Sequence, residues 1–367
     1  MNSSRVPSFL RDSLFILAIS AGALAVTEIA VRLFLPQEYR TTSLNGLTVG
    51  MNDSILGHLN QPGAHVILNG PEFSVDYQVS DEGFRDEAIH SVAKPDSVRR
   101  ILLLGDSFTW GAGVAYDGIW PVVFERRCLA DGLRLDIVKA GVSGFDTRQE
   151  VLYLERLLPL YKPDMVVLAF LPNDLFTNLP IADNGSIDAA RALEQDSLLV
   201  RGQEDKGSRF ELVTLLKRFL ISNDGLYTTL YFNTGRSGNF TLPMDNRLRE
   251  QVTVTKQLLA RAFRFCRSNK TPLIVVSIPQ EIQVLVKARN ERPKGIDVDF
   301  IDEEFSAFAH DSSFAWIPVL PELAARYASG PGDLFFRLDG HLNGEGNAAV
   351  GNYFYQRFRE LLNDRPE

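Results

Sequence analysis

The sequence predicts an α/β protein built on a parallel sheet of five strands with helices on both faces. From Arg100 onward, near-continuous apolar runs alternate with amphipathic stretches, the pattern of strands that are covered on both sides. Right-handed crossovers through the helices would connect these strands. The expected strands are 101–105, 134–141, 164–170, 273–278 and 314–319, and the expected helices are 117–131, 146–160, 246–269 and 344–363.

The composition is that of a folded protein with an acidic balance. The chain has 367 residues, of which 45% are hydrophobic and 23% charged, enough for a large core. A net charge of -8 and the lack of a basic stripe argue against nucleic-acid binding. Cys128 and Cys266 lie in predicted helices and are interpreted as small buried apolar residues. With no CxxC motif and no clustered His and Cys, neither a metal nor a cofactor is expected.

An apolar stretch near the N-terminus is long enough to cross a membrane. Residues 13–35 would form a helix of roughly 34 Å, and the hydrocarbon core of a bilayer is about 30 Å thick. Glu28 and Arg32 are four residues apart, so they can pair on one helical face near the outer interface. A cleaved signal peptide is the alternative, but "LFLPQEYR" offers no good cleavage site. We therefore favour an uncleaved anchor.

The charges that flank this stretch indicate its orientation. Arg5 and Arg11 precede it, which places the N-terminus in the cytoplasm by the positive-inside tendency. Arg32 and Arg40 on the far side reduce that bias. The sequence therefore predicts a single-pass protein of the inner membrane, with residues 13–35 in the lipid bilayer and the bulk of the chain in the periplasm or its equivalent.

Three regions follow one another along the chain. Residues 1–36 form the cytoplasmic N-terminus and anchor. Residues 37–97 are rich in Gly, Pro, Asn and His and carry alternating runs such as "AHVILNG" and "FSVDYQVS", which predict a small β-rich collar. Residues 98–367 form the α/β domain. Within it, 175–245 breaks the alternation with polar, glycine-rich segments around a helical "FELVTLLKRFLISND", an insertion that would form a lid or bind a protein partner.

Polar residues follow the strands of the predicted sheet. In an open parallel sheet, ligands bind at the carboxyl ends of the strands. The first strand is followed by Gly105, Asp106 and Ser107, the second ends on Gly141 with Gly144 close behind, the third is followed by Asn173 and Asp174, and Asp339 and His341 precede the last helix. The topology therefore predicts that these groups meet at one edge.

These residue types fit nucleophilic catalysis. A serine hydroxyl is a weak nucleophile, and His341 is the candidate base that would take the proton from Ser107. Asp339 would hold the tautomer of this imidazole and stabilise its charged form. The backbone N–H groups of Ser107 and Gly144 and the side-chain amide of Asn173 would donate hydrogen bonds to an oxyanion. Each residue alone is also typical of an ordinary turn or cap, so the prediction depends on their combination.

The four segments resemble the SGNH hydrolase family, the GDSL-type esterases and lipases. The matching segments are "LLLGDSFTWG", "KAGVSGFDT", "PDMVVLAFLPNDL" and "DGHLNGEG", in the family's order, within about residues 98–363. The resemblance does not cover the anchor, the collar or the 175–245 insertion. It implies a flavodoxin-like three-layer α/β/α fold in which Ser107 is the nucleophile, Ser107, Gly144 and Asn173 form the oxyanion hole, and Asp339 and His341 complete the triad.

Two positions depart from the family pattern. The last block usually reads Asp-x-x-His, whereas Gly340 alone separates Asp339 from His341, as in related polysaccharide O-acetyltransferases. This spacing leaves Asp333 open as a second candidate for the acid. In the second block, Lys139 stands where an Asn often precedes Ala-Gly, and we interpret it as structural.

Two other α/β folds do not fit the sequence. The nucleophile elbow of α/β-hydrolases reads Gly-x-Ser-x-Gly, but Thr109 occupies the position of its second glycine. A dinucleotide-binding fold needs Gly-x-Gly-x-x-Gly at the start of a helix, and "GDSFTWGAG" does not supply it in register.

The predicted function is that of a membrane-anchored serine esterase. Its substrate would be a small acyl ester or an acylated glycan, with an O-acetyl or other short acyl group on an extracytoplasmic carbohydrate or lipid. The Asp-x-His spacing and the tether leave open an O-acyltransferase that modifies an envelope polysaccharide. A non-catalytic envelope scaffold or binding subunit that retains the motifs is a third hypothesis.

Overall fold

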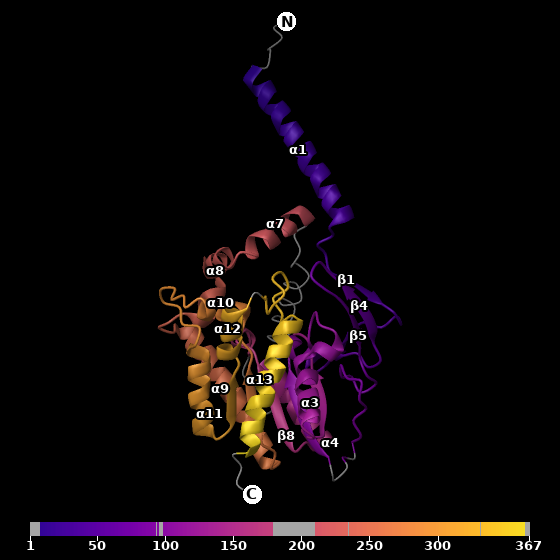
Figure 1. The fold of residues 1–367 in the computed structure, drawn as a ribbon, viewed down its shortest axis with the longest axis vertical. Coiled ribbons are helices and arrows are strands. Elements are labelled where there is room, and N and C mark those ends of the chain that lie inside the picture. Colours follow the sequence, from indigo (N-terminus) through magenta and orange to yellow (C-terminus); the bar gives the residue numbers. More distant parts are fainter. Residues whose placement is uncertain are drawn as a thin grey trace.

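A five-stranded parallel sheet forms the centre of the α/β domain (Figure 1). The computed structural model describes residues 8–92, 94, 98–178, 210–233, 235–330 and 332–363. The strands are β6 (Arg99–Gly105), β7 (Leu135–Gly141), β8 (Met165–Phe170), β9 (Leu273–Ser277) and β10 (Ala315–Pro318), in the spatial order β10-β9-β8-β6-β7. All neighbours pair in parallel. This is the flavodoxin-like order, in which the chain reverses its winding between the first and third strands, so the predicted fold class is confirmed.

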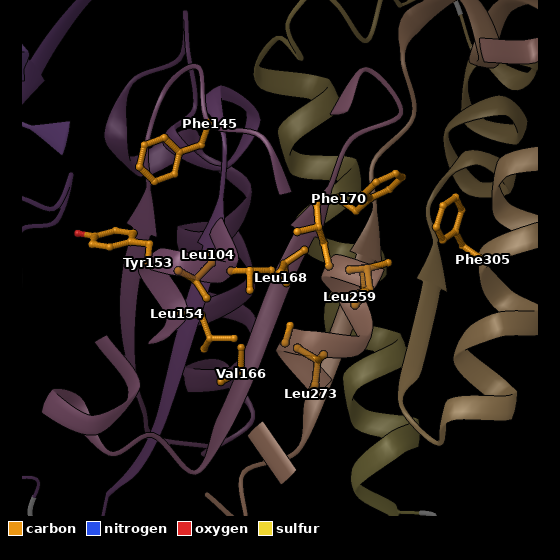
Figure 2. Packing of buried hydrophobic residues seen from close by; sticks show 14 of the residues in the cluster. Leu104, Phe145, Tyr153, Leu154, Val166, Leu168, Phe170, Leu259, Leu273 and Phe305 are labelled. Carbon is orange, nitrogen blue, oxygen red and sulfur yellow. The ribbon is translucent and has the colours of Figure 1, made fainter. Parts of the chain in front are cut away.

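Helices cover both faces of this sheet. Alternate residues of each strand point to opposite faces, so that Leu102 and Leu104 join one hydrophobic core while Ile101 and Leu103 join the other. Helices α4 (Thr147–Tyr161), α9 (Asn246–Ser268) and α11 (Phe300–Ser312) contribute to the first core (Figure 2). Helices α3 (Trp120–Ala130), α12 (Leu320–Ser329) and α13 (Gly344–Asn363) contribute to the second. The result is the expected three-layer α/β/α arrangement.

Shorter elements connect these layers. They are α2 (Ser107–Trp110), the 3-10 turn η1 (Tyr116–Gly118), α5 (Asp174–Thr177), α7 (Glu211–Ile221), α8 (Asp224–Asn233), η2 (Gly235–Phe240) and α10 (Glu281–Ala288). Of the predicted insertion at 175–245, residues 179–209 and 234 lie outside the described residues. Its described part contains α7, α8 and η2, and its role as a lid or a protein-binding segment stays a prediction.

The two cysteines are buried and free. Cys128 lies in α3 and Cys266 in α9, so they belong to cores on opposite faces of the sheet. Burial raises the pKa of each thiol to about 12. Both cysteines therefore act as small apolar side chains, as the sequence predicted.

The region before the sheet is rich in β-structure. Strands β1 (Arg40–Ser43), β4 (His65–Asn69) and β5 (Ser74–Gln78) form an antiparallel sheet, and β2 (Gly50–Asp53) pairs with β3 (Gly57–Asn60). We refer to described residues 37–92 as the collar. The boundaries at 36/37 and 97/98 stay predictions.

The N-terminal helix α1 (Ser8–Phe34) projects away from the rest of the protein (Figure 1). Most of its apolar side chains are exposed, and within the described residues it is the one helix long and apolar enough to cross a membrane. Arg32 Nε donates to Glu28 Oε1 at 2.7 Å, which confirms the predicted pairing of these two residues. The helix fits either a membrane anchor or a signal sequence by its length and composition.

Lys139 holds the collar against the sheet through a buried ionic network. Its ammonium lies 3.1 Å from Asp86 Oδ2 and 2.9 Å from Glu125 Oε2. His90 links two carboxylates of the same network, with Nε2 3.0 Å from Asp86 Oδ2 and Nδ1 2.6 Å from Asp136 Oδ1. Because Asp86 and His90 belong to the collar and Asp136 and Lys139 to β7, these pairs connect the two units.

This network predicts a stability that depends on the charge of His90. Burial disfavours the charged imidazole, but the hydrogen bonds to Asp136 and Asp86 outweigh burial and raise the pKa of His90 from 6.5 to about 9. The stabilisation is therefore complete below pH 6.5 and is lost as the pH rises through 9, an effect on the order of 3 kcal/mol. We expect His90→Asn to be less stable at pH 6.5 and to lose this slope in urea unfolding measured between pH 6 and 10.

The matched control is His310→Asn, because His310 is an exposed histidine of α11. Its slope should equal that of the wild type. A wild-type slope in His90→Asn would contradict the assignment of this pH dependence to His90.

Candidate active site

Ser107 lies at the carboxyl end of β6, where the strand turns directly into α2. Asp106 caps this short helix, since its Oδ1 accepts a hydrogen bond from the N–H of Phe108 at 2.8 Å. Ser107 is the first helical residue and is partly exposed, whereas Asp106 and Phe108 are buried. The turn therefore presents the hydroxyl at the rim of the sheet while its neighbours fix the backbone.

Two glycines make room for this turn. A Cβ on Gly105 would lie 2.0 Å from Thr109 Oγ1, and a Cβ on Gly141 would lie 2.7 Å from the backbone nitrogen of Trp110. Helix α2 thus packs directly onto the ends of β6 and β7. The glycine of the Gly-Asp-Ser segment is needed for this close approach rather than for an unusual backbone angle.

His341 reaches Ser107 across the fold. Its Nε2 lies 2.7 Å from Ser107 Oγ, and its Nδ1 is hydrogen-bonded to Asp339 Oδ1. The imidazole packs against the ring of Phe108, with 5.0 Å between the ring centres, and is largely shielded from solvent. The three residues predicted as a catalytic triad therefore form one chain of hydrogen bonds, although Ser107 and His341 are 234 positions apart.

The short Asp-x-His spacing is explained by the backbone at Gly340. This residue has a φ of +89°, in the left-handed region that glycine adopts without strain. Its N–H donates to the carbonyl of Phe336 at 2.6 Å, which closes a tight turn. The turn brings Asp339 back onto His341. Asp333, the second candidate, instead accepts a hydrogen bond from Arg337 Nη2 at 2.8 Å and is more than half exposed.

Gly144 and Asn173 lie at the same edge of the sheet as Ser107. Gly144 follows β7, is exposed, and has a φ of +85° that disfavours any side chain there. Asn173 follows β8, is exposed, and precedes the first residue of α5. The strands before Ser107 and Asn173 are the neighbours between which the winding reverses, the usual place for a ligand in such a sheet. The roles of Gly144 and Asn173 as oxyanion donors stay predictions.

Buried carboxyl groups lie beneath the turn that carries Ser107. Burial raises the pKa of Asp106 to about 6. Burial also raises the pKa of Glu150 and Asp174 far above the usual range, and each repels the charge of neighbouring carboxylates. Thr147 Oγ1 donates to Asp174 Oδ2 at 2.7 Å. Among the described residues, no group of three or more His, Cys, Asp or Glu side chains is placed to hold a metal ion.

The collar holds the loop that carries the acid, a contact that the sequence did not reveal. The carboxylate of Glu72 accepts hydrogen bonds from the backbone N–H groups of Leu338, at 3.0 Å, and Asp339, at 2.9 Å. Tyr39 Oη donates to the same carboxylate at 3.2 Å. Burial, followed by the charges of Asp339 and Glu72, raises the pKa of Tyr39. Glu72 therefore fixes the backbone of the acid from a position 267 residues away.

Further collar residues hold the other turns at this edge. Arg85 donates to the carbonyls of Trp110, Gly111 and Val114 at 2.6 to 2.8 Å. Asn60 Nδ2 donates to the carbonyl of Gly141 at 3.0 Å. His58 Nε2 is hydrogen-bonded to the carbonyl of Ser143 at 2.8 Å. Burial lowers the pKa of Arg85 to about 10. The turns after β6 and β7 and the acid loop are thus all fixed by the collar.

Comparison with known proteins identifies the family. The sequence model of the GDSL-like Lipase/Acylhydrolase family matches residues 103–349, which include all five predicted site residues. The chain belongs to the GDSL-like lipase/acylhydrolase family. The family resemblance predicted from the sequence is therefore confirmed, together with the flavodoxin-like fold that it implied.

Individual GDSL relatives are distant. An arylesterase of Vibrio mimicus is 26% identical over 88 residues, which are 24% of this chain and 44% of that protein. The psychrotrophic esterase EstA from Pseudoalteromonas sp. aligns with 72% of this chain and 100% of its own, at 13% identity and a TM-score of 0.43. An acetyl xylan esterase, AlAXEase, aligns with 70% of this chain and 98% of its own, at 14% identity and a TM-score of 0.42.

The left-handed turn of this GDSL site predicts a specific sensitivity at Gly340. Gly340→Ala introduces a Cβ that meets no atom within 4 Å, so its cost comes only from the positive φ, about 1–2 kcal/mol. Relief of this strain would separate Asp339 from His341, and we expect kcat for a soluble ester to fall by on the order of 10²-fold. The measurement is steady-state hydrolysis together with the melting temperature.

Gly332→Ala is the matched control. Gly332 lies on the same connection before α13, also has no atom within 4 Å of an added Cβ, and has no positive φ. Its kcat should stay at the wild-type level. Equal activities for the two variants would show that the turn at Gly340 does not hold the acid in place.

Proposed function

We propose that this protein is a serine esterase in which Ser107 is the nucleophile, His341 the general base and acid, and Asp339 the residue that orients and stabilises the imidazole. The observation that carries this proposal is the 2.7 Å contact between His341 Nε2 and Ser107 Oγ, with Asp339 on the other nitrogen of the ring. A nucleophile, its base and an orienting acid in one hydrogen-bonded chain form the arrangement that acyl transfer requires.

The first half of the reaction forms an acyl-enzyme. Ser107 Oγ attacks the ester carbonyl while His341 Nε2 takes the hydroxyl proton, and the charged imidazole is stabilised by Asp339. The negative charge on the carbonyl oxygen would be met by the backbone N–H groups of Ser107 and Gly144 and the amide of Asn173, each contributing about 2.7–4 kcal/mol. The tetrahedral intermediate then collapses, and His341 gives its proton to the oxygen of the leaving alcohol.

The second half releases the acid and restores the enzyme. Water attacks the carbonyl carbon of the acyl group on Ser107 while His341 Nε2 takes a proton from this water. The second tetrahedral intermediate expels Ser107 Oγ, which recovers the proton from the imidazole. The products are the alcohol and the carboxylic acid, and no cofactor or metal takes part in any step.

The proposed location is the outer side of the inner membrane. Residues 13–35 would stay in the bilayer as a single span, with the N-terminus in the cytoplasm and the catalytic domain in the periplasm or its equivalent. The proposed substrate is an O-acetyl or other short acyl ester on an envelope carbohydrate or lipid. The length and apolar character of α1 support the span, and the family supports an acyl ester.

Acyl transfer to an alcohol is the second candidate reaction. Its supporting observation is the Asp-x-His turn, because this spacing is shared with polysaccharide O-acetyltransferases and the turn at Gly340 brings both side chains together. The chemistry up to the acyl-enzyme is the same, and a sugar hydroxyl would replace water in the second half. The partition of product between free acetate and acetylated saccharide distinguishes the two reactions.

Substitutions of the triad test the proposal. We expect the full-length protein to hydrolyse p-nitrophenyl acetate, and Ser107→Ala to lower kcat by on the order of 10⁶-fold. Asp339→Asn should lower kcat by about 10⁴-fold, because the imidazole would be held in the wrong tautomer. Initial rates from nitrophenolate absorbance measure both effects.

Asp333→Asn is the control for the acid, since Asp333 contacts Arg337 and not the imidazole. It should retain the wild-type rate. A rate in Ser107→Ala equal to that of the wild type would contradict the proposed nucleophile. A folded wild-type protein with no turnover on any ester, or on any acyl donor with a saccharide acceptor, would instead favour a non-catalytic scaffold.

A further inference from the structure

The outer face of α7 is apolar and exposed. Four of its side chains are between 38% and 74% exposed: Val213, Leu216, Phe219 and Leu220. The spacings 213–216–220 and 216–219 place the four helical residues on one side of the helix. The opposite side carries the buried residues Glu211, Thr214 and Ile221. The described part of the protein therefore leaves this face uncovered.

The charges that accompany this face are positive. Lys217 is exposed and Arg218 is partly exposed, while the one acidic residue of α7, Glu211, is buried. A helix with an apolar face and flanking basic side chains is typical of segments that lie in the interface of a membrane with anionic lipids. A protein partner would not require positive charges beside the apolar face, so these charges favour a membrane as the occupant of this face.

Hydrogen bonds hold the start of α7 against the end of α1. The carboxylate of Glu28, in α1, accepts from the backbone N–H groups of Glu211 and Leu212, each at 2.9 Å. The side chain of Glu211 in turn accepts from the N–H of Gln37, just beyond α1, at 3.0 Å. Figure 1 shows one end of α7 beside the lower end of α1, with α7 extending sideways from there toward α8. A membrane that α1 crosses would therefore have α7 at its surface.

The catalytic edge of the sheet faces the same side. Helix α13 begins three residues after His341, and Figure 1 shows its C-terminal end far from α1, so its beginning lies toward α1 and α7. The five residue-to-residue steps from Phe34 to Tyr39 span at most about 18 Å when extended. Tyr39 contacts Glu72, and Glu72 contacts the backbone of Asp339. The triad is therefore held near the point where α1 ends.

We propose that α7 lies in the interface of the bilayer that α1 crosses, with its apolar face among the acyl chains, and that the catalytic site acts on acyl esters carried at that membrane surface. The second part of this inference rests on the proposed esterase function, and the first part rests on α1 as an anchor. Together, α1 and α7 fix both the distance and the orientation of the catalytic edge relative to the lipid.

The position of α7 is tested by fluorescence quenching in vesicles. The full chain, reconstituted into vesicles of phosphatidylethanolamine and phosphatidylglycerol, carries Phe219→Trp, and the signal of the wild-type tryptophans is subtracted. We expect brominated acyl chains to quench the added signal. The control is Leu160→Trp, because Leu160 is exposed at the C-terminal end of α4, at the edge of the sheet opposite to Ser107.

Quenching in Phe219→Trp and none in Leu160→Trp supports the inference. No quenching in Phe219→Trp overturns it and leaves a second copy of the chain or another protein as the occupant of this face. This readout needs no enzymatic activity, so it stands even when the proposed function fails.

The catalytic part is tested with two acetate esters, one soluble and one embedded in the bilayer. Leu216→Glu/Phe219→Glu places two charges on the apolar face, far from the triad in sequence and outside every contact of the catalytic residues. We expect hydrolysis of soluble p-nitrophenyl acetate to stay unchanged. Acetate release from an O-acetylated octadecyl glucoside embedded in the same vesicles should fall by on the order of tenfold or more, since the site would no longer be held at the lipid surface.

Leu129→Glu/Leu160→Glu is the matched control, because both leucines are exposed at the ends of α3 and α4 that lie opposite to the catalytic edge. It should retain both activities. Equal activity of the α7 variant and the wild type on the embedded ester overturns the proposed orientation. Loss of activity on both substrates also overturns it, since α7 would then act on the fold and not on access to lipid.

Discussion

The hydrogen bond between His341 and Ser107 is the contact on which the site depends. Ser107 follows the first strand of the sheet and His341 precedes the last helix, so almost the whole domain must fold before the two meet. The parallel topology brings distant parts of the chain together, because the carboxyl ends of all the strands lie at the same edge of the sheet. The remaining positioning is local: Gly105 allows α2 to approach β6, and Gly340 turns Asp339 back onto the imidazole.

The collar supplies the second part of this positioning. The family match begins at residue 103, yet Glu72 holds the acid loop and Arg85 holds the turn after α2. A buried charge is costly unless it is hydrogen-bonded, and the buried Arg85 donates to three backbone carbonyls. Glu72 is partly buried and accepts from two backbone N–H groups of the acid loop. The edge that carries the site is thus assembled between two units, the collar and the α/β domain, and the network around Lys139 also joins them along β7.

The sequence predicted the sheet and the triad because both leave local signals. Buried strands such as β6 and β8 read as apolar runs, and the four segments carry recognisable residue types at their ends. The contact between Glu72 and Asp339 leaves no such signal, since an acidic residue in a β-rich segment resembles any solvated side chain. Helices α10, α11 and α12 were missed because they lie within or next to polar or proline-containing sequence. The exposed face of α7 could be recognised only after its neighbours were placed, because an amphipathic pattern alone predicts a buried face.

The activation of Ser107 by His341 is tested most directly by labelling with a fluorophosphonate, followed by mass spectrometry of the modified peptide. This reagent reacts with a serine hydroxyl only when a base activates it and an oxyanion site receives the phosphonyl oxygen. We expect a single adduct on Ser107 in the full-length protein and a strong loss of labelling in His341→Ala. An adduct on another residue, or labelling of Ser107 that does not depend on His341, would contradict this expectation.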